Sequence, residues 1–159
     1  GGTVEVPYLV LQFCPRGSLF RVAGRLSLHD ALRAVLQAGA ALQRCYERGV
    51  LIKHGDLKPE NLLVDEVGRV VVTDFQTALR ERVTRDAVQG TLGYYAPVPD
   101  ERADVYALGR VLVDLVAGLD APVARAPAEV RGLVSAAQNL RMRMREFVEE
   151  AERILHRLA

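Results

Sequence analysis

The chain has 159 residues, half of them hydrophobic, and a formal net charge of +1 at pH 7. This length and composition predict one globular domain with a single core and argue against disorder over any long stretch. The nearly neutral charge argues against a protein that binds nucleic acid or an acidic membrane surface by bulk electrostatics.

The sequence also predicts the compartment. No apolar run approaches the roughly 20 residues of a membrane span, and no signal peptide is visible. The two cysteines, Cys14 and Cys45, have no CxxC or metal-binding spacing, which indicates free thiols in a reducing environment. We therefore expect a soluble, intracellular protein of the cytoplasm that contacts no membrane.

The first predicted element is the run YLVLQF at residues 8–13. A short run rich in β-branched, aromatic and aliphatic residues favours a buried strand. A helix is predicted over residues 27–50, with Ser27 as N-cap, Asp30 three residues later and Gly49 at its end. Its apolar residues recur at helical spacing, so this helix is predicted to form part of the core.

Residues 54–75 concentrate the chemistry of the chain, with the sequence HGDLKPENLLVDEVGRVVVTDF. Asp56, Lys58 and Asn61 fall on a short loop, and Asp74 follows 13 residues after Asn61, beyond a predicted hairpin. Phosphoryl transfer from ATP needs a carboxylate facing the acceptor hydroxyl, a cation on the moving phosphate, and oxygen ligands for a metal. A single Asp beside Gly is usually only a turn, but the whole run favours this chemistry.

This spacing resembles the catalytic loop and metal-binding turn of the eukaryotic protein kinase family, with HGD for HRD and DFQ for DFG. The order Lys-Pro-Glu-Asn is similar to serine/threonine kinases rather than tyrosine kinases. The resemblance implies that Asp56 and Lys58 are catalytic and that Asn61 and Asp74 bind Mg²⁺. It also implies ATP as the nucleotide, with Lys58, Asn61 and Asp74 among its contacts, and His54 packed against the Phe of the metal turn.

The same resemblance extends to the beginning of the chain. YLVLQFCPRGSLF is similar to the last strand of the kinase N-lobe, the hinge and the start of the next helix. It implies that backbone groups of Gln12 and Cys14 face the adenine edge, with Leu11 at the gatekeeper position. Ser18 would then lie near the ribose, and Leu63 would form the floor under the adenine.

Further motifs follow the predicted hairpin. Residues 76–93 are the predicted activation segment, and GTLGYYAP resembles the family's GTxxYxAPE stretch. That match places Thr91 where the family has a threonine that braces the catalytic acid and lysine. A second amphipathic helix is predicted over residues 104–118, where DVYALG resembles the buried helix whose first Asp, here Asp104, holds the backbone of the catalytic loop. One or two helices are predicted over residues 130–158.

The sequence departs from the family's pattern at several positions. Gly55 replaces the Arg that reads a phosphorylated activation loop, so we expect no phosphate-dependent ordering through that pocket. Gln76 replaces the flexible Gly after Asp-Phe, which restricts rearrangement of the metal turn. Val98 replaces the Glu of Ala-Pro-Glu, which leaves Arg143 without its usual partner. No Gly-rich phosphate loop or strand lysine is recognised, because the chain begins at about the hinge.

We therefore expect an α+β fold, mainly α: a protein kinase-like C-lobe with a small catalytic β-hairpin and with the N-lobe largely absent. Residues 1–159 would form one kinase-like domain. Within it, residues 1–20 would supply the last N-lobe strand and the hinge, and residues 21–159 the C-lobe.

Three functions from different classes remain. The first is a serine/threonine protein kinase in the form of a partial catalytic domain, with a protein substrate and with regulatory proteins as a second class of partner. The second is a pseudokinase that serves as a binding module; the motif changes favour it, while retention of the four catalytic residues counts against it. The third is a small-molecule kinase of the aminoglycoside or choline type, where HGD is the usual form of the loop. GTLGYYAP and DVYALG belong to protein kinases, so the third function ranks last.

Overall fold

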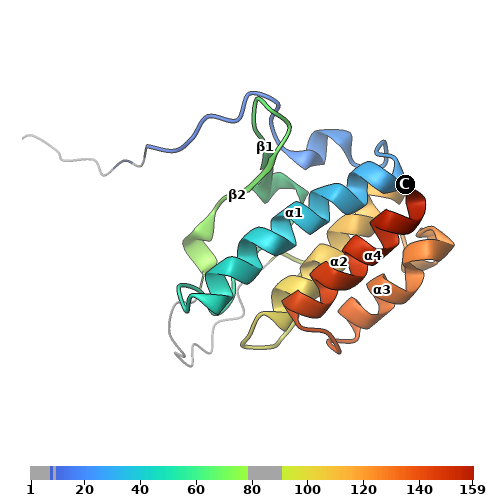
Figure 1. Ribbon diagram of the computed structural model, residues 1–159. Helices are drawn as coiled ribbons and strands as arrows, with labels where there is room; N and C mark the ends of the chain where they lie inside the picture. Colours follow the sequence, from blue (N-terminus) through green and yellow to red (C-terminus); the bar gives the residue numbers. More distant parts are fainter. Residues whose placement is uncertain (1–7, 9, 79–90) are drawn as a thin grey trace, which may run out of the picture.

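The structure is a computed structural model that describes residues 8, 10–78 and 91–159. Within these residues the α-helices are α1 (Leu28–Glu47), α2 (Arg102–Ala117), α3 (Ala128–Gln138) and α4 (Met144–Leu158) (Figure 1). The strands are β1 (Leu62–Val64) and β2 (Val70–Val72), and short 3-10 turns occur at Leu19–Val22, Pro59–Asn61, Phe75–Thr77 and Val123–Arg125. The predicted fold class, mainly α with a small β-hairpin, is confirmed. No described helix is both long and apolar enough to span a bilayer.

The prediction of a buried strand at residues 8–13 is wrong. The described residues there adopt no strand, and Tyr8, Val10 and Phe13 are 85%, 87% and 84% exposed. Figure 1 shows this segment running away from the helices. A strand is stable only when its backbone N–H and C=O groups pair with a neighbouring strand. The sheet in the described part of the chain is the β1–β2 hairpin, and it does not extend to this segment.

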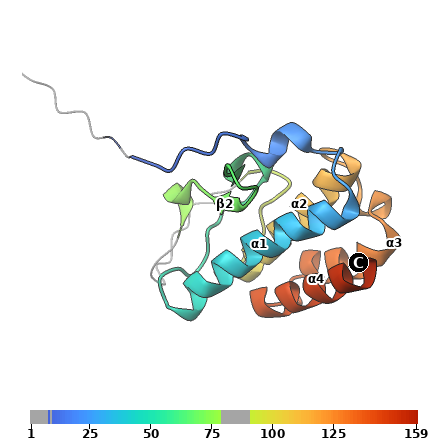
Figure 2. The same cartoon turned by 45° about the horizontal axis from the view of Figure 1, so that its top comes forward.

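Helix α1 begins as the sequence predicts. The hydroxyl of Ser27 accepts a hydrogen bond from the backbone N–H of Asp30 at 3.1 Å, which satisfies one of the unpaired N–H groups of the first turn. Gly49, just after the helix, has a φ of 65°, a conformation that glycine adopts without steric cost. Helix α4 runs alongside α1 and packs against it (Figure 2).

Helix α2 forms the centre of the core. Four apolar residues that recur at helical spacing are fully buried: Val105, Leu108, Leu112 and Leu115. The helix contacts α1, α3 and α4. At Gly109 it approaches α3 so closely that a Cβ atom there would lie 2.9 Å from the Cβ of Ala137. Helices α3 and α4 confirm the prediction of terminal helices after residue 130.

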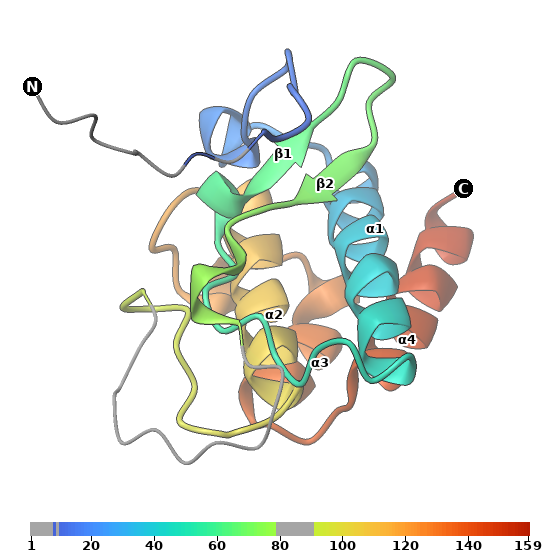
Figure 3. The same ribbon diagram turned by 90° about the vertical axis from the view of Figure 1, so that its left-hand side faces the viewer.

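The hairpin pairs Leu62 with Val72 and Val64 with Val70 in antiparallel register. Asp65 closes its turn by accepting hydrogen bonds from the backbone N–H of Arg69, which also donates through its side chain. The hairpin lies above α2 and beside α1 (Figure 3). The side chain of Gln37 in α1 accepts a hydrogen bond from the N–H of Val70 at 3.0 Å. An isolated hairpin is marginal, so this packing on the helices sets its position.

Candidate active site

The loop between α1 and β1 is fastened to the core by Asp104, near the start of α2. One oxygen of this buried carboxylate accepts the N–H of His54 at 2.6 Å, and the other accepts the N–H of Gly55 at 2.9 Å. The hydroxyl of Tyr46 donates to the same carboxylate at 2.5 Å. Burial raises the pKa of Asp104, and these donors act in the opposite direction. The prediction that Asp104 holds the backbone of the loop is confirmed.

His54 connects the loop to the turn after β2. Its ring packs edge-on against Phe75 with 4.7 Å between the ring centroids, and its Nε2 lies 3.0 Å from the carbonyl oxygen of Thr73. The ring is fully buried. The predicted packing of His54 against the aromatic residue of the second motif is therefore confirmed.

Asp56 lies at the centre of a hydrogen-bonded cluster. Its Oδ2 atom is 2.9 Å from Nζ of Lys58, and its Oδ1 atom accepts both the hydroxyl of Thr91 at 2.6 Å and the N–H of Thr91 at 3.1 Å. Partial burial raises the pKa of Asp56, but the Thr91 hydroxyl and the Lys58 cation outweigh it and hold the pKa below its usual range. The carboxylate is therefore ionised at neutral pH.

Lys58 shares a second partner with Asp56. Its Nζ donates to the hydroxyl oxygen of Thr91 at 2.8 Å, so the three side chains form a closed set of contacts. Thr91 directly follows residues 79–90, which make up most of the predicted activation segment and lie outside the described residues. The contacts place Thr91 where the sequence pattern predicts it, against both the acid and the lysine.

Asn61 is hydrogen-bonded to Asp56 through its amide nitrogen, and its side-chain oxygen is a candidate metal ligand. Its amide nitrogen donates to the carbonyl oxygen of Asp56 at 2.8 Å and to the carboxylate at 3.3 Å. The side-chain carbonyl oxygen is the atom that remains for a metal. The N–H of Thr73 donates to the backbone carbonyl of Asn61 at 3.0 Å, which brings the chain leading into Asp74 against the loop.

Asp74 adopts an uncommon backbone conformation. It has φ 63° and ψ 68°, in the left-handed region, and its side chain is exposed at the start of the turn Phe75–Thr77. A residue other than glycine in this region costs about 1 kcal/mol or more, and such positions concentrate at functional sites. An amide oxygen and a carboxylate are hard ligands of the type that Mg²⁺ uses when phosphate oxygens and water complete its octahedron. Asn61 and Asp74 therefore fit this ion by their chemistry.

The residues predicted to contact the base and the ribose lie before α1 and in β1. Ser18 pairs with Leu63 in an isolated β-bridge, and the N–H of Val64 donates to the carbonyl of Gly17 at 2.8 Å. Cys14 is buried, while Gln12 is exposed, and the Cys14 thiol lies 3.9 Å from the carbonyl oxygen of Gln12. Leu63 is in β1, two residues after Asn61, so the hairpin connects the residues predicted to contact the base and ribose to the cluster around Asp56.

Two departures from the motif have a structural counterpart. Gly55 has a φ of 86°, which a side chain would strain, so the glycine suits the backbone of this loop. Val98 stands where the family has the glutamate that pairs with Arg143, and Arg143 pairs instead with Glu101 at 3.5 Å. Lys53 donates to the carbonyl of Val98 at 3.2 Å, three residues before Glu101.

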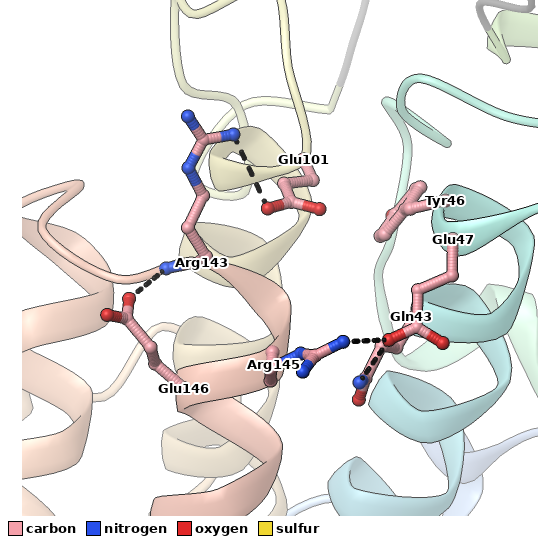
Figure 4. Close-up of a pocket in the computed structure, with 7 residues that line it drawn as sticks. All are labelled: Gln43, Tyr46, Glu47, Glu101, Arg143, Arg145 and Glu146. Atoms are coloured by element: carbon pink, nitrogen blue, oxygen red, sulfur yellow. Dashed lines mark hydrogen bonds and ion pairs between the residues drawn. The ribbon is translucent and has the colours of Figure 1, made fainter. Parts of the chain in front are cut away.

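The Arg143–Glu101 pair lines a pocket of about 470 Å³ between the end of α1 and the beginnings of α2 and α4 (Figure 4). Arg145 reaches across it to Glu47 at 2.8 Å. The pocket contains none of the residues predicted to be catalytic. Arg143, Arg145 and Glu47 are exposed and Glu101 is partly exposed. Ion pairs at the surface contribute little free energy.

One group was missed by sequence reasoning. Asp114, in the middle of α2, is fully buried and accepts a hydrogen bond from the hydroxyl of Tyr94 at 2.5 Å. It also pairs with Arg110, one helical turn earlier. The signal was present in the sequence, since Asp114 is an acid inside an apolar helical stretch, and such residues are rarely buried without a partner.

Comparisons with known proteins follow the same pattern. Residues 3–154 match the family described as the protein kinase domain. The chain is 42% identical over 125 residues to CBL-interacting protein kinase 16 of Oryza sativa subsp. japonica, a match that covers 70% of this chain and 27% of the relative. It is 37% identical over 125 residues to CBL-interacting serine/threonine-protein kinase 5 of Arabidopsis thaliana (70% and 28%), and 32% identical over 122 residues to Aurora kinase B of Xenopus tropicalis (70% and 33%). The matched part spans about a quarter to a third of the length of these relatives.

Proposed function

The chain belongs to the protein kinase domain family, and from this premise we propose that it is part of the catalytic domain of a serine/threonine protein kinase. The reaction is transfer of the terminal phosphoryl group of ATP to a hydroxyl group of a protein. The observation that carries the proposal is the closed cluster of Asp56, Lys58 and Thr91, built on a loop that Asp104 fixes to the core. Residues 1–20 would supply the hinge side of this domain and residues 21–159 its C-lobe.

Asp56 is the proposed base. Because its pKa lies below the usual range, the carboxylate is ionised and can accept a hydrogen bond from the substrate hydroxyl and orient it. It would take up the proton of that hydroxyl as the phosphoryl group is transferred. Lys58, 2.9 Å from that carboxylate, would place its positive charge beside the transferred phosphoryl group. Thr91 contacts both side chains and would keep them in the geometry that in-line transfer requires.

ATP supplies the phosphoryl group, and Mg²⁺ neutralises the charge on its phosphates, when they are bound. On this side of the site we assign Asn61 and Asp74 as metal ligands, because they carry the oxygen donors that suit this ion. Lys58 is assigned to the phosphates as well. For the base and the ribose we assign Leu63, Ser18 and the backbone of Gln12 and Cys14, of which Ser18 and Leu63 are paired in the structure.

A second candidate function is that of a pseudokinase, a binding module without turnover. The position after Asp74-Phe75 favours it, because Gln76 lacks the backbone freedom of glycine. For either function the second class of partner is a regulatory protein, which is supported by relatives whose names describe them as CBL-interacting. The location we propose is the cytoplasm.

The first experiment is calorimetric titration of the chain with ATP, with and without Mg²⁺, beside an Asp74→Ala variant and an Asp120→Asn control. Asp120 is exposed and has been given no role in the site. We expect Mg²⁺-dependent binding that is lost in Asp74→Ala and unchanged in Asp120→Asn. Binding that is equal in all three proteins contradicts the assignment of Asp74.

Turnover is tested with the longest natural form of the protein and a mixture of Ser/Thr peptides, with an aminoglycoside as the alternative acceptor. Peptide phosphorylation supports the proposal. Binding of ATP and Mg²⁺ without phosphorylation of either acceptor favours the pseudokinase, and phosphorylation of the aminoglycoside alone favours a small-molecule kinase.

A further inference from the structure

The turn Leu19–Val22 lies beside the loop that carries the proposed catalytic residues. It contacts the turn Pro59–Asn61, which directly follows Lys58, and Figure 3 shows the two turns, one blue and one green, next to each other. Just before the first turn, Ser18 pairs with Leu63 of β1. Exposed side chains of this turn therefore lie at the edge of the candidate site.

Arg21 is the basic residue of this turn, and its side chain is exposed. A Cβ atom at Gly17 would lie 3.3 Å from Nε and 3.4 Å from Cζ of Arg21, so the guanidinium group lies over the backbone of Gly17. The carbonyl of Gly17 is itself fixed, because it accepts the N–H of Val64 at 2.8 Å. The positive charge of Arg21 is thereby held beside Ser18, the residue assigned to the ribose.

No carboxylate pairs with this charge in the part of the chain that the structure describes. Arg21 has no ion pair there, and neither has Glu60, the acidic residue of the turn Pro59–Asn61. The sequence contains no Asp or Glu from residue 6 to residue 29, whereas Arg16, Arg21 and Arg25 all lie in this stretch and are exposed. A chain with a net charge of only +1 thus concentrates positive charge in the segment next to the site.

The simplest alternative is that Arg21 is a solvated surface charge without a role. Arg131 on α3 fits that description, because it is exposed and has no ion pair among the described residues. Arg21 differs from it in position, since its turn contacts the catalytic loop and its guanidinium lies against backbone that β1 fixes. A planar guanidinium held in one place binds a carboxylate through two parallel hydrogen bonds and loses little side-chain entropy in doing so.

We propose that Arg21 is a specificity-determining residue that binds an acidic side chain, Asp or Glu, of the protein substrate. The inference rests on the proposed function, because it names the class of protein that the same site phosphorylates. The acidic residue lies within about four positions of the acceptor hydroxyl, since an extended chain advances by about 3.3 Å per residue and the two turns are in contact. Glu60 repels an acidic residue beside it, so the preference is confined to the position that faces Arg21.

The test uses pairs of Ser/Thr peptides that carry Asp or Asn at one position, scanned over about four residues on either side of the acceptor. They are assayed with the longest natural form of the protein, as wild type, Arg21→Gln and the matched control Arg131→Gln. We expect one position at which Asp raises kcat/KM about fivefold over Asn, in the wild type and in the control. This preference should disappear in Arg21→Gln, while kcat/KM for the Asn peptide stays within about twofold.

Charge reversal separates a direct contact from general electrostatics. Arg21→Glu should invert the preference at the same position, so that a Lys peptide becomes a better substrate than the Asp peptide. A preference for Asp in Arg21→Gln equal to that of the wild type overturns the proposal. An equal fall of kcat/KM for the Asp and Asn peptides, or a higher KM for ATP with an unchanged peptide preference, also overturns it, because Arg21 would then act on the fold or on the nucleotide.

Peptide binding separates the inference from the proposed function. A wild type that phosphorylates no peptide contradicts the kinase function, and the same peptide pairs are then titrated into the protein without turnover. Tighter binding of the Asp peptide that is lost in Arg21→Gln supports recognition of an acidic segment by Arg21. This difference should shrink as the salt concentration rises from about 0.1 M to about 1 M, because exposed charges are screened. Equal binding of the Asp and Asn peptides to the wild type overturns the proposal.

Discussion

The loop of residues 54–61 and the segment of residues 8–13 both match motifs of the same family, yet the structure treats them differently. Three residues from other parts of the chain contact the loop: Asp104 and Phe75 at His54, and Thr91 at Asp56. Within the described part of the chain this segment has no strand partner, and the side chains of Tyr8, Val10, Leu11 and Phe13 face solvent. The difference teaches that a polar loop can be fixed by a few side-chain acceptors, whereas a β segment depends on the backbone of a neighbouring strand.

The largest effect is expected from a substitution of Asp56 in the loop. Asp56→Asn keeps the size of the side chain and removes its charge, so phosphoryl transfer should fall by about 10³-fold while ATP binding is largely retained. The measurement pairs a phosphorylation assay with nucleotide titration. Turnover equal to that of the wild type contradicts the role of Asp56, and Asp120→Asn serves as the control for loss of an exposed carboxylate.

The attachment of the loop to the core is the next target. Asp104→Ala leaves the buried N–H groups of His54 and Gly55 and the hydroxyl of Tyr46 without their acceptor. We expect the free energy of unfolding to fall by about 3 kcal/mol, as measured by urea denaturation. Glu152→Ala, at an exposed position of α4, should change it by less than about 0.5 kcal/mol. Equal effects would show that Asp104 is not what holds the loop.

The packing of α2 against α3 can be tested by substituting one glycine in each helix. Gly109→Ala would place a Cβ 2.9 Å from that of Ala137, and this overpacking should cost about 2 kcal/mol. In Gly132→Ala, within α3, the new Cβ meets no atom within 4 Å, so the variant should be more stable by about 0.5–1 kcal/mol. Thermal unfolding measures both. The same sign for the two variants would contradict the close approach of α2 and α3.

The hairpin between Asn61 and Asp74 has a turn whose stability should depend on pH. Hydrogen bonds from Arg69, first of all its backbone N–H, hold the pKa of Asp65 below its usual range. Because the folded-state pKa is depressed, the stabilisation is present above the ordinary value of about 3.9 and is lost as the pH falls through the folded-state pKa. Asp65→Asn should therefore weaken the decrease in unfolding free energy below about pH 4. An identical pH profile in the variant would show that the turn does not depend on the charge.

The smallest effect is expected in the exposed segment. Val10→Ser and Phe13→Ser remove side chains that are 87% and 84% exposed, so each should change the free energy of unfolding by less than about 0.5 kcal/mol. Leu62→Ala, at a fully buried position of β1, should cost about 2–4 kcal/mol under the same conditions. A large loss in either serine variant would mean that the segment is packed in solution.

Local patterns in the sequence determined most of the scaffold. Ser27 and Asp30 mark the start of α1 because capping acts within four residues, and the apolar spacing of α2 specifies its buried face in the same way. The loop residues were predicted together because Asp56, Lys58 and Asn61 lie within six positions of one another. Short-range rules are reliable where the physical interaction is itself short-range.

Tertiary structure alone decided the remaining features. Residues 8–13 have the composition of a strand, but pairing with a distant segment determines whether a strand exists. The contacts of Tyr94 with Asp114 and of Arg143 with Glu101 join residues that no local pattern connects. The sequence shows that Asp114 is an acid among apolar residues, and only the folded chain shows which group satisfies it, because a buried charge takes its partner from whatever the packing of the helices brings within reach.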